Sequence, residues 1–146
     1  MTVPVYFETN IPSDTADGLA VQEKLVSLME QFHYSPRDVF AMRLSLEESI
    51  TNAIRHGNKF AADKRVAINC TITDTKMRVV VQDEGDGFEP ESVPDPTDME
   101  FIERPSGRGL LLMKAYLNHV EYSDGGRRLT MVRERNSALP ILDDDE

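Results

Sequence analysis

Three polar side chains that can do chemistry recur at four-residue intervals in one stretch of the chain. Glu48, Asn52 and His56 lie within residues 44–58, which read LSLEESITNAIRHGN. Residues four apart share one face of an α-helix, so a carboxylate, an amide and an imidazole would line up in a row. Such a row is either a solvated polar face or a catalytic set made of a base, a metal ligand and a polar support.

The surrounding residues predict the helix that would position this row. Ser35, Pro36 and Asp38 form a helix start, with a capping hydroxyl, a proline at the first helical position and an acid three residues after the cap. Gly57 is typical of the glycine that follows the end of a helix. Apolar residues recur at helical spacing on the side away from the polar row, at Val39, Met42, Leu46, Ile50 and Ala53.

Length and composition indicate one soluble globular domain. The chain has 146 residues, of which 40% are hydrophobic and 29% are charged, which suffices for a single core. The apolar runs are too short to cross a bilayer, and the N-terminus lacks the pattern of a signal peptide, so we expect a cytoplasmic protein. The single cysteine, Cys70, excludes an intrachain disulfide and is expected to fill space in a core strand.

The charge balance narrows the class of partner. The net charge of −10 argues against general nucleic-acid binding, which requires a basic surface. An ATP site remains possible because it needs only local donors and a metal. One cysteine and three scattered histidines, His33, His56 and His119, do not form a zinc site.

The order of expected elements predicts a two-layer α/β sandwich with helices on one face of a mixed, mainly antiparallel sheet. We expect one domain over 1–135 and a disordered acidic tail over 136–146. The expected strands are Val3–Thr9, Val66–Thr73, Met77–Gln82, Val120–Ser123 and Arg128–Glu134. The expected helices run from Ser13 or Asp14 to Phe32, from Ser35 to Gly57, and from Leu110 to Tyr116.

Residues 83–106 are rich in glycine, proline and acids and lie between the expected strand 77–82 and the expected helix 110–116. A stretch of this length and composition predicts a functional lid or a disordered loop, and 99–102 could form a turn of helix within it. It is flanked by two glycine-bearing loops, 83–88 (DEGDGF) and 106–110 (SGRGL). The second is either a phosphate cradle at a helix N-terminus or an ordinary glycine before a helix. Asp83 is either a turn residue or an acceptor for an exocyclic amine such as that of adenine. Neither a P-loop nor the protein-kinase motif set is present.

Taken in order, these motifs resemble the Bergerat-fold ATPase superfamily, which includes type II topoisomerases, heat-shock chaperones, mismatch-repair ATPases and histidine kinases. The motifs are Glu48-x-x-x-Asn52 on a helix, Asp83-x-Gly85-x-Gly87 after a strand, and Gly107-x-Gly109 opening a helix. Within the superfamily, residues 48–57 (ESITNAIRHG) and 106–110 are most similar to the anti-sigma-factor serine-protein kinases. The resemblance covers nearly the whole chain.

The resemblance implies a role for each motif. Asn52 would be the protein ligand of Mg²⁺, Glu48 the general base or water-positioning residue, and Asp83 the acceptor of the adenine amino group. His56 is expected to support the end of the helix and the lid rather than touch ATP. The remaining nucleotide contacts would come from Gly85, Gly87, Ser106, Gly107 and Gly109, with Arg104 and Arg108 either neutralising phosphate charge or facing solvent. Arg127 and Arg128 depart from the pattern, because the superfamily often has a threonine near the adenine at this place.

The function that the resemblance implies is that of an ATP- and Mg²⁺-dependent serine/threonine-protein kinase acting as an anti-sigma-factor-type transcription regulator. In the family, such a kinase phosphorylates an anti-anti-sigma protein, and the unphosphorylated form of that protein competes with a sigma factor for the kinase. Family members often form homodimers, and the first strand with its flanking helix is a candidate surface.

Two alternatives stay open at this point. One is a module that holds nucleotide, or none, and only sequesters a regulatory protein. The other is an ATP-hydrolysing fragment of a larger machine, against which we weigh the initial methionine and the solvated tail. We expect no direct contact with nucleic acid or membrane.

Overall fold

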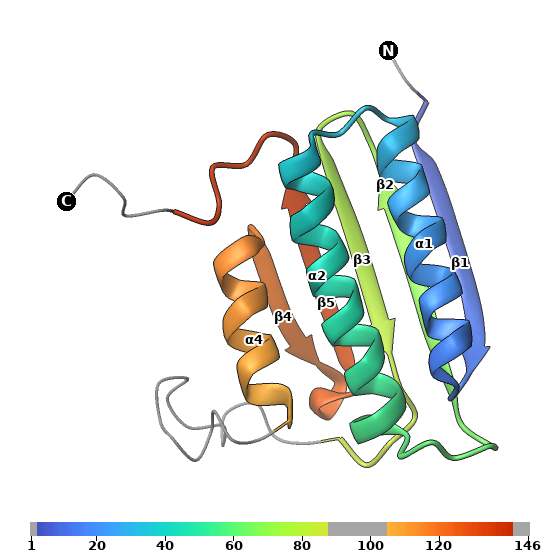
Figure 1. Ribbon diagram of the computed structural model, residues 1–146. Coiled ribbons are helices and arrows are strands. Elements are labelled where there is room, and N and C mark those ends of the chain that lie inside the picture. The colour runs from blue at the N-terminus through green and yellow to red at the C-terminus, as the bar shows by residue number, and fades with distance from the viewer. Residues whose placement is uncertain (1–2, 88–104, 142–146) are drawn as a thin grey trace.

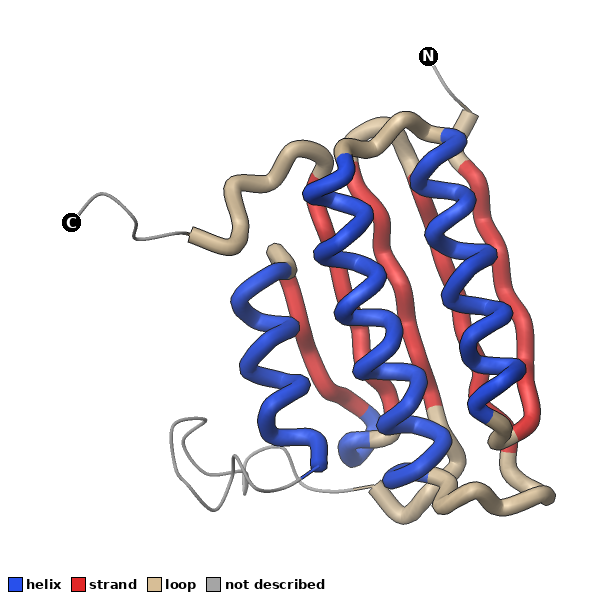
Figure 2. The backbone as a smooth tube through the Cα atoms, in the orientation of Figure 1, coloured by secondary structure: helices blue, strands red, loops and turns tan. Residues whose placement is uncertain are grey.

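The computed structural model describes residues 3–87 and 105–141. In this part of the chain three α-helices cover one face of a five-stranded sheet, so the predicted two-layer sandwich is confirmed (Figures 1 and 2). In chain order the elements are β1 (Val5–Pro12), α1 (Thr15–Gln31), α2 (Pro36–Asn52), the π-helical turn η1 (Ala53–Gly57), β2 (Arg65–Ile72), β3 (Lys76–Gln82), α4 (Pro105–Tyr116), β4 (His119–Ser123), the 3₁₀ turn η3 (Asp124–Gly126) and β5 (Arg128–Glu134).

The strands lie in the order β1-β2-β3-β5-β4, and each neighbouring pair is antiparallel. The sheet was expected to be mixed, but among the described strands no pair is parallel. Strands that follow one another in the chain are neighbours in the sheet, with one exception: β5 lies between β3 and β4, so β4 is at the edge. This arrangement places the turn between β4 and β5 next to the end of β3, where the site lies.

Both long helices begin where their capping residues predict. The Asp14 carboxylate accepts the N–H of Ala16 at 2.8 Å, and Ser35 Oγ accepts the N–H of Asp38 at 3.1 Å. Each cap satisfies a backbone donor that the helix itself leaves unpaired. Helix α2, which carries Glu48 and Asn52, therefore starts at a fixed residue.

The predicted apolar stripe of α2 is the centre of the core. Met42, Leu46 and Ile50 are at most 2% exposed and pack, with residues of α1, against the covered face of the sheet. Cys70 in β2 is buried among them, and burial raises the pKa of its thiol to about 12, which suits a space-filling role. A packed stripe on one side fixes which side of α2 faces away from the sheet.

An acid that was expected only to serve the start of α2 has a further role. The side chains of Asp38 and Arg133 are both 0% exposed, and Arg133 Nε donates to Asp38 Oδ1 at 2.8 Å. The second oxygen, Oδ2, accepts the N–H of Asn136 at 2.8 Å. This buried ion pair joins the start of α2 to the end of β5.

Two local expectations about glycines are wrong. Helix α2 does not continue as a regular α-helix to Gly57 but changes to a π-turn at Ala53, and the φ angle of Gly57 is not in the left-handed region, so it is not a cap of the expected kind. Residues 106–109 were expected to precede a helix, yet they lie within the first turns of α4. That helix starts at Pro105 because proline suits the first helical position.

The remaining expectations concern residues near the gaps. The expected turn at 99–102 and Arg104 lie outside the described residues. Residues 136–141, placed in the expected tail, contact α2, since Arg37 Nη2 donates to the carbonyls of Ala138 and Pro140 at 2.7 and 2.8 Å. The boundary at 135 stays a prediction. Helices long and apolar enough to span a membrane are absent from the described part of the chain.

Candidate functional site

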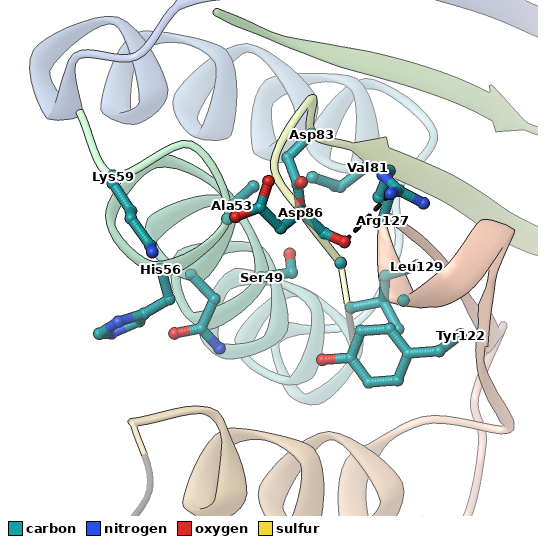
Figure 3. A pocket seen from close by; sticks show the side chains of 14 residues that line it. Ser49, Ala53, His56, Lys59, Val81, Asp83, Asp86, Tyr122, Arg127 and Leu129 are labelled. Carbon is teal, nitrogen blue, oxygen red and sulfur yellow. Dashed lines mark hydrogen bonds between the residues drawn. The ribbon is translucent and has the colours of Figure 1, made fainter. Parts of the chain in front are cut away.

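A pocket of about 310 Å³ lies where α2 and its π-turn meet the ends of β3, β4 and β5. Figure 3 shows His56 and Lys59 on one side of it and Tyr122 and Leu129 on the other, with Ser49 and Asp83 between them. The pocket is lined by Ser49, Asn52, Ala53, His56, Gly57, Lys59, Val81, Asp83, Asp86, Gly87, Tyr122, Gly126, Arg127 and Leu129. Residues from 49 to 129 thus meet in one hollow.

The first two members of the predicted polar row contact each other. Asn52 Nδ2 donates to Glu48 Oε2 at 3.1 Å, one helical turn away, and both side chains are half-buried. Because the amide nitrogen is engaged by the carboxylate, the amide oxygen is the atom left to meet a cation in the pocket. An oxygen ligand of this kind suits Mg²⁺, which keeps several waters and needs few protein ligands.

Helix α4 approaches the same carboxylate from the other side. A Cβ atom at Gly109 would lie 2.2 Å from Glu48 Cγ and 2.3 Å from Glu48 Oε2, so a larger residue there would displace the Glu48 side chain. Ser106, Gly107 and Arg108 lie in the first turns of this helix. The N-terminus of a helix of this length offers unpaired N–H groups and a positive dipole end that favour a phosphate.

Asp83 is held at the end of β3 by backbone hydrogen bonds. Its N–H donates to the carbonyl of Arg127 at 2.9 Å, and its Oδ1 accepts the N–H of Gly85 at 2.8 Å. Burial raises the pKa of the Asp83 carboxyl, while the bond from Gly85 and the charge of Arg127 lower it. The half-buried carboxylate lines the pocket and has a second oxygen available for a ligand donor.

The π-turn brings the backbone of α2 against the Asp83 loop. A Cβ at Gly57 would lie 2.4 Å from Asp83 Cγ, and a Cβ at Gly85 would lie 1.9 Å from the carbonyl oxygen of Gly57. A side chain at Gly57 would displace the Asp83 carboxylate, and one at Gly85 would clash with backbone. Gly87 needs glycine for two reasons, because its φ of 76° favours glycine and a Cβ there would lie 2.3 Å from the carbonyl oxygen of Gly125.

His56 does not continue the polar row, since it falls in the π-turn, where the helical spacing widens. It lines the pocket, and desolvation together with the neighbouring Arg55 lowers the pKa of its imidazole. Among the described residues, no three His, Cys, Asp or Glu side chains gather to form a metal site. A cation here would need most of its ligands from a nucleotide and water.

Several residues of the site were not predicted. Ser49, buried beside Asn52, could have been found from its spacing of three residues to that amide. Tyr122 could have been found from its alternation with Val120 along β4. Its ring lines the pocket, and burial raises the pKa of its hydroxyl to about 12. Asn58 had no local signal.

Asn58 is 1% exposed and holds the Asp83 loop from the side of α2. Its Oδ1 accepts the N–H of Glu84 at 2.7 Å, and its Nδ2 donates to Ser13 Oγ and to the carbonyl of Arg65, both at 3.0 Å. The loop is therefore anchored to the starts of α1 and β2.

Comparisons with known proteins bear on this arrangement. A family model described as the histidine kinase-like ATPase domain matches residues 11–133. The serine-protein kinase RsbW of Staphylococcus epidermidis is 23% identical over 137 residues, which cover 88% of this chain and 86% of that protein. The anti-sigma F factor of Clostridium perfringens is 31% identical over 102 residues, which cover 66% of this chain and 72% of that protein.

The fold is also similar to a solved structure. The structure of the RsbU and RsbW domains of a Mycobacterium tuberculosis protein superimposes with a TM-score of 0.60 at 13% identity. The match covers 92% of this chain and 32% of that longer one, and it concerns the fold alone.

Proposed function

This chain belongs to the histidine kinase-like ATPase domain family, in the group of anti-sigma-factor kinases, and we propose that it is an ATP-dependent serine/threonine-protein kinase. The observation that carries the proposal is that Asn52 and the Asp83 carboxylate line one pocket, while Glu48, hydrogen-bonded to Asn52, packs against Gly109 in the first turns of α4. Each supplies one of the contacts that ATP and a hydroxyl nucleophile need.

Adenine binds at the Asp83 end of the pocket. The second oxygen of the Asp83 carboxylate accepts a hydrogen bond from the exocyclic amine, while the N–H of Gly85 holds the first oxygen and Gly87 lines the pocket. Tyr122 and Leu129 provide apolar surface beside it. A partly desolvated carboxylate discriminates strongly here, because a base without the amine would leave it unpaired.

The triphosphate extends from this end toward α4. The helix N-terminus, with Ser106, Gly107 and Gly109, holds phosphate oxygens, and Arg104 and Arg108 neutralise their charge. Asn52 would hold Mg²⁺ through its amide oxygen, and the metal would supply charge neutralisation at the phosphates. Phosphoryl transfer depends mainly on alignment and charge, so a site with few protein ligands is sufficient.

Glu48 acts on the acceptor. Its carboxylate takes the proton of a serine or threonine hydroxyl, whose oxygen bonds to the γ-phosphorus as the bond to the β-phosphate oxygen breaks. The bond from Asn52 fixes the carboxylate one turn from the metal ligand. The acceptor that fits this family is an anti-anti-sigma-type protein, and a sigma factor would compete with its unphosphorylated form.

The first test is calorimetry of ATP binding, with and without Mg²⁺, on the parent and on Asp83→Asn and Asn52→Ala. We expect Asp83→Asn to weaken binding about 10- to 100-fold, as expected for a lost hydrogen bond to a charged group. Asn52→Ala should abolish the dependence on Mg²⁺. Absence of binding by the folded parent at millimolar ATP would refute the proposal.

The second test is phosphotransfer from γ-labelled ATP to purified anti-anti-sigma-type proteins of the same organism. Glu48→Gln keeps a group that can pair with Asn52 but removes the base, so transfer should fall at least ~100-fold while ATP binding is retained. Transfer at the parental rate would exclude Glu48 as the base. A partner that binds without being phosphorylated would favour a sequestering module instead.

A further inference from the structure

Arg127 stands where the superfamily often has a threonine, and each of its three guanidinium nitrogens donates to a backbone carbonyl. Nε donates to the carbonyl of Gly85 at 2.8 Å, Nη2 to that of Asp86 at 3.0 Å, and Nη1 to that of Asp124 at 3.1 Å. Figure 3 shows the guanidinium at the edge of the pocket, with a dashed line to Asp86. One side chain thus bridges the loop after β3 and the turn before β5.

The two segments that Arg127 joins have unusual backbone conformations, and the anchor from Asn58 holds the loop only at Glu84. Both contain left-handed backbone, at Gly87 with φ of 76°, at Asp124 with φ of 52° and at Gly125 with φ of 63°. Asp124 is not a glycine, so it bears the steric cost of this conformation. A planar group with five donors in a fixed geometry suits three carbonyls that lie in different directions, whereas an ammonium does not.

The main chain of Arg127 serves the same loop. Its carbonyl accepts the N–H of Asp83 at 2.9 Å, and the Asp83 carboxylate in turn accepts the N–H of Gly85, whose carbonyl the Arg127 side chain binds. Asp83, Gly85 and Arg127 therefore form a closed ring of hydrogen bonds around the group that reads the base. Displacing the guanidinium would free the carbonyl of Gly85, the residue whose N–H orients the Asp83 carboxylate.

We propose that Arg127 is a positioning residue for base recognition, which holds the 83–87 loop so that the Asp83 carboxylate meets the adenine amine. The inference rests on the proposed function, because it concerns the same pocket. It differs from a direct contact with the base, since the three donors described above all go to protein carbonyls. The proposed role of Arg127 therefore differs from that of the threonine that the superfamily often has near the adenine.

The neighbouring arginine offers a matched control. Arg128 Nε donates to Gln82 Oε1 at 3.0 Å in an exposed contact, and Gln82 Nε2 donates to Asp124 Oδ2 at 2.8 Å, but neither bond belongs to the ring. Arg127→Gln and Arg128→Gln therefore remove the same charge from adjacent residues, and only the first opens the ring of hydrogen bonds. Arg127→Lys keeps the charge and loses the planar geometry.

The experiment measures the affinities for Mg-ATP and Mg-ITP, since the base of ITP lacks the exocyclic amine. We expect Arg127→Gln to weaken ATP binding about 10-fold and ITP binding less than twofold, so that the ATP-to-ITP ratio falls toward that of Asp83→Asn. Arg127→Lys should resemble Arg127→Gln, and Arg128→Gln should keep the parental ratio. Thermal denaturation of each variant checks that it is folded.

A double-mutant cycle separates positioning from a general effect on the fold. If Arg127 acts through Asp83, Arg127→Gln should change ATP affinity less than twofold when Asp83 is already asparagine. An additive loss in that background, or an unchanged ATP-to-ITP ratio in Arg127→Gln, would overturn the inference. A parent that binds ATP and depends on Asp83 would leave the proposed function intact in that case, whereas a parent that binds no ATP would refute the function itself.

Discussion

Replacing Gly57 by alanine tests whether the close approach of the π-turn and the Asp83 loop is what shapes the site. The new Cβ would lie 2.4 Å from Asp83 Cγ and 2.5 and 2.8 Å from the two carboxylate oxygens. Ordinary contact begins near 3.4 Å, so the carboxyl group must retreat by about 1 Å. The backbone of Gly57 is not left-handed, and alanine is therefore not strained there by its own conformation.

The expected loss follows from the reach of a hydrogen bond. A contact near 2.8 Å that lengthens by about 1 Å is no longer a hydrogen bond. Losing one from the adenine amine to a carboxylate costs about 1.5–3 kcal/mol, which is a 10- to 100-fold loss of ATP affinity. Stability should change little, because alanine restricts the unfolded chain by about 0.4–1 kcal/mol, which offsets part of the crowding.

The assay is calorimetry with Mg-ATP on the Gly57→Ala variant, accompanied by its thermal unfolding curve. Gly18→Ala in α1 is the control, since a Cβ there meets only the ends of the Ile50 and Ile54 side chains, at 2.9 and 3.0 Å. The control should keep its ATP affinity whatever happens to its stability. A folded Gly57→Ala variant that binds ATP as tightly as the parent would refute the reasoning.

Three further predictions concern Asp83 as the proposed adenine acceptor, Glu48 as the proposed general base, and the buried pair of Asp38 and Arg133. Because burial raises the pKa of the Asp83 carboxyl, this group becomes protonated at a pH above its ordinary pKa of 3.8. The ATP-to-ITP affinity ratio should therefore fall as the pH falls through the raised pKa, and the Asp83→Asn variant should show no such fall. Gly109→Ala should displace Glu48 by about 1 Å and slow phosphotransfer about 100-fold with a smaller effect on ATP binding, as single-turnover kinetics can measure. Arg133→Met should cost about 3–5 kcal/mol in urea unfolding because it leaves the Asp38 carboxylate buried without its cation, and Arg133→Met combined with Asp38→Asn should recover part of that loss.

The elements of the fold were predictable because their signals are local. The apolar stripe of α2, the caps at Asp14 and Ser35, and the β-branched residues of β2 and β3 each act within a few residues. The order of these elements then left few ways to cover one face of a sheet. Strand β5 was placed at its observed bounds, since a glycine-rich turn precedes it.

The contacts that complete the site were not predictable in this way. Arg133 pairs with an acid 95 residues earlier, and Arg127 binds carbonyls 41 and 42 residues earlier. Contacts between residues so far apart cannot be predicted from the local sequence. The π-turn at Ala53–Gly57 was not predicted from the local sequence, and its last residue lies against Gly85 of the 83–87 loop. The alignment of Glu48 and Asn52 on one face of α2 was predictable, because a spacing of four residues is itself a helical signal.

Gly57 and Gly109 show that a motif can single out a glycine while suggesting the wrong structural reason for it. Gly57 and Gly109 look like a helix cap and a loop residue, yet each is required by a carboxylate that would occupy the place of its Cβ, Asp83 in one case and Glu48 in the other. Conformational freedom and close approach both select glycine, and sequence does not distinguish them. The two cases differ in the effect of substitution. Replacing a glycine that needs its φ lowers stability, whereas replacing Gly57 or Gly109 displaces the carboxylate packed against it. We therefore expect the site to be lost before the fold at both positions.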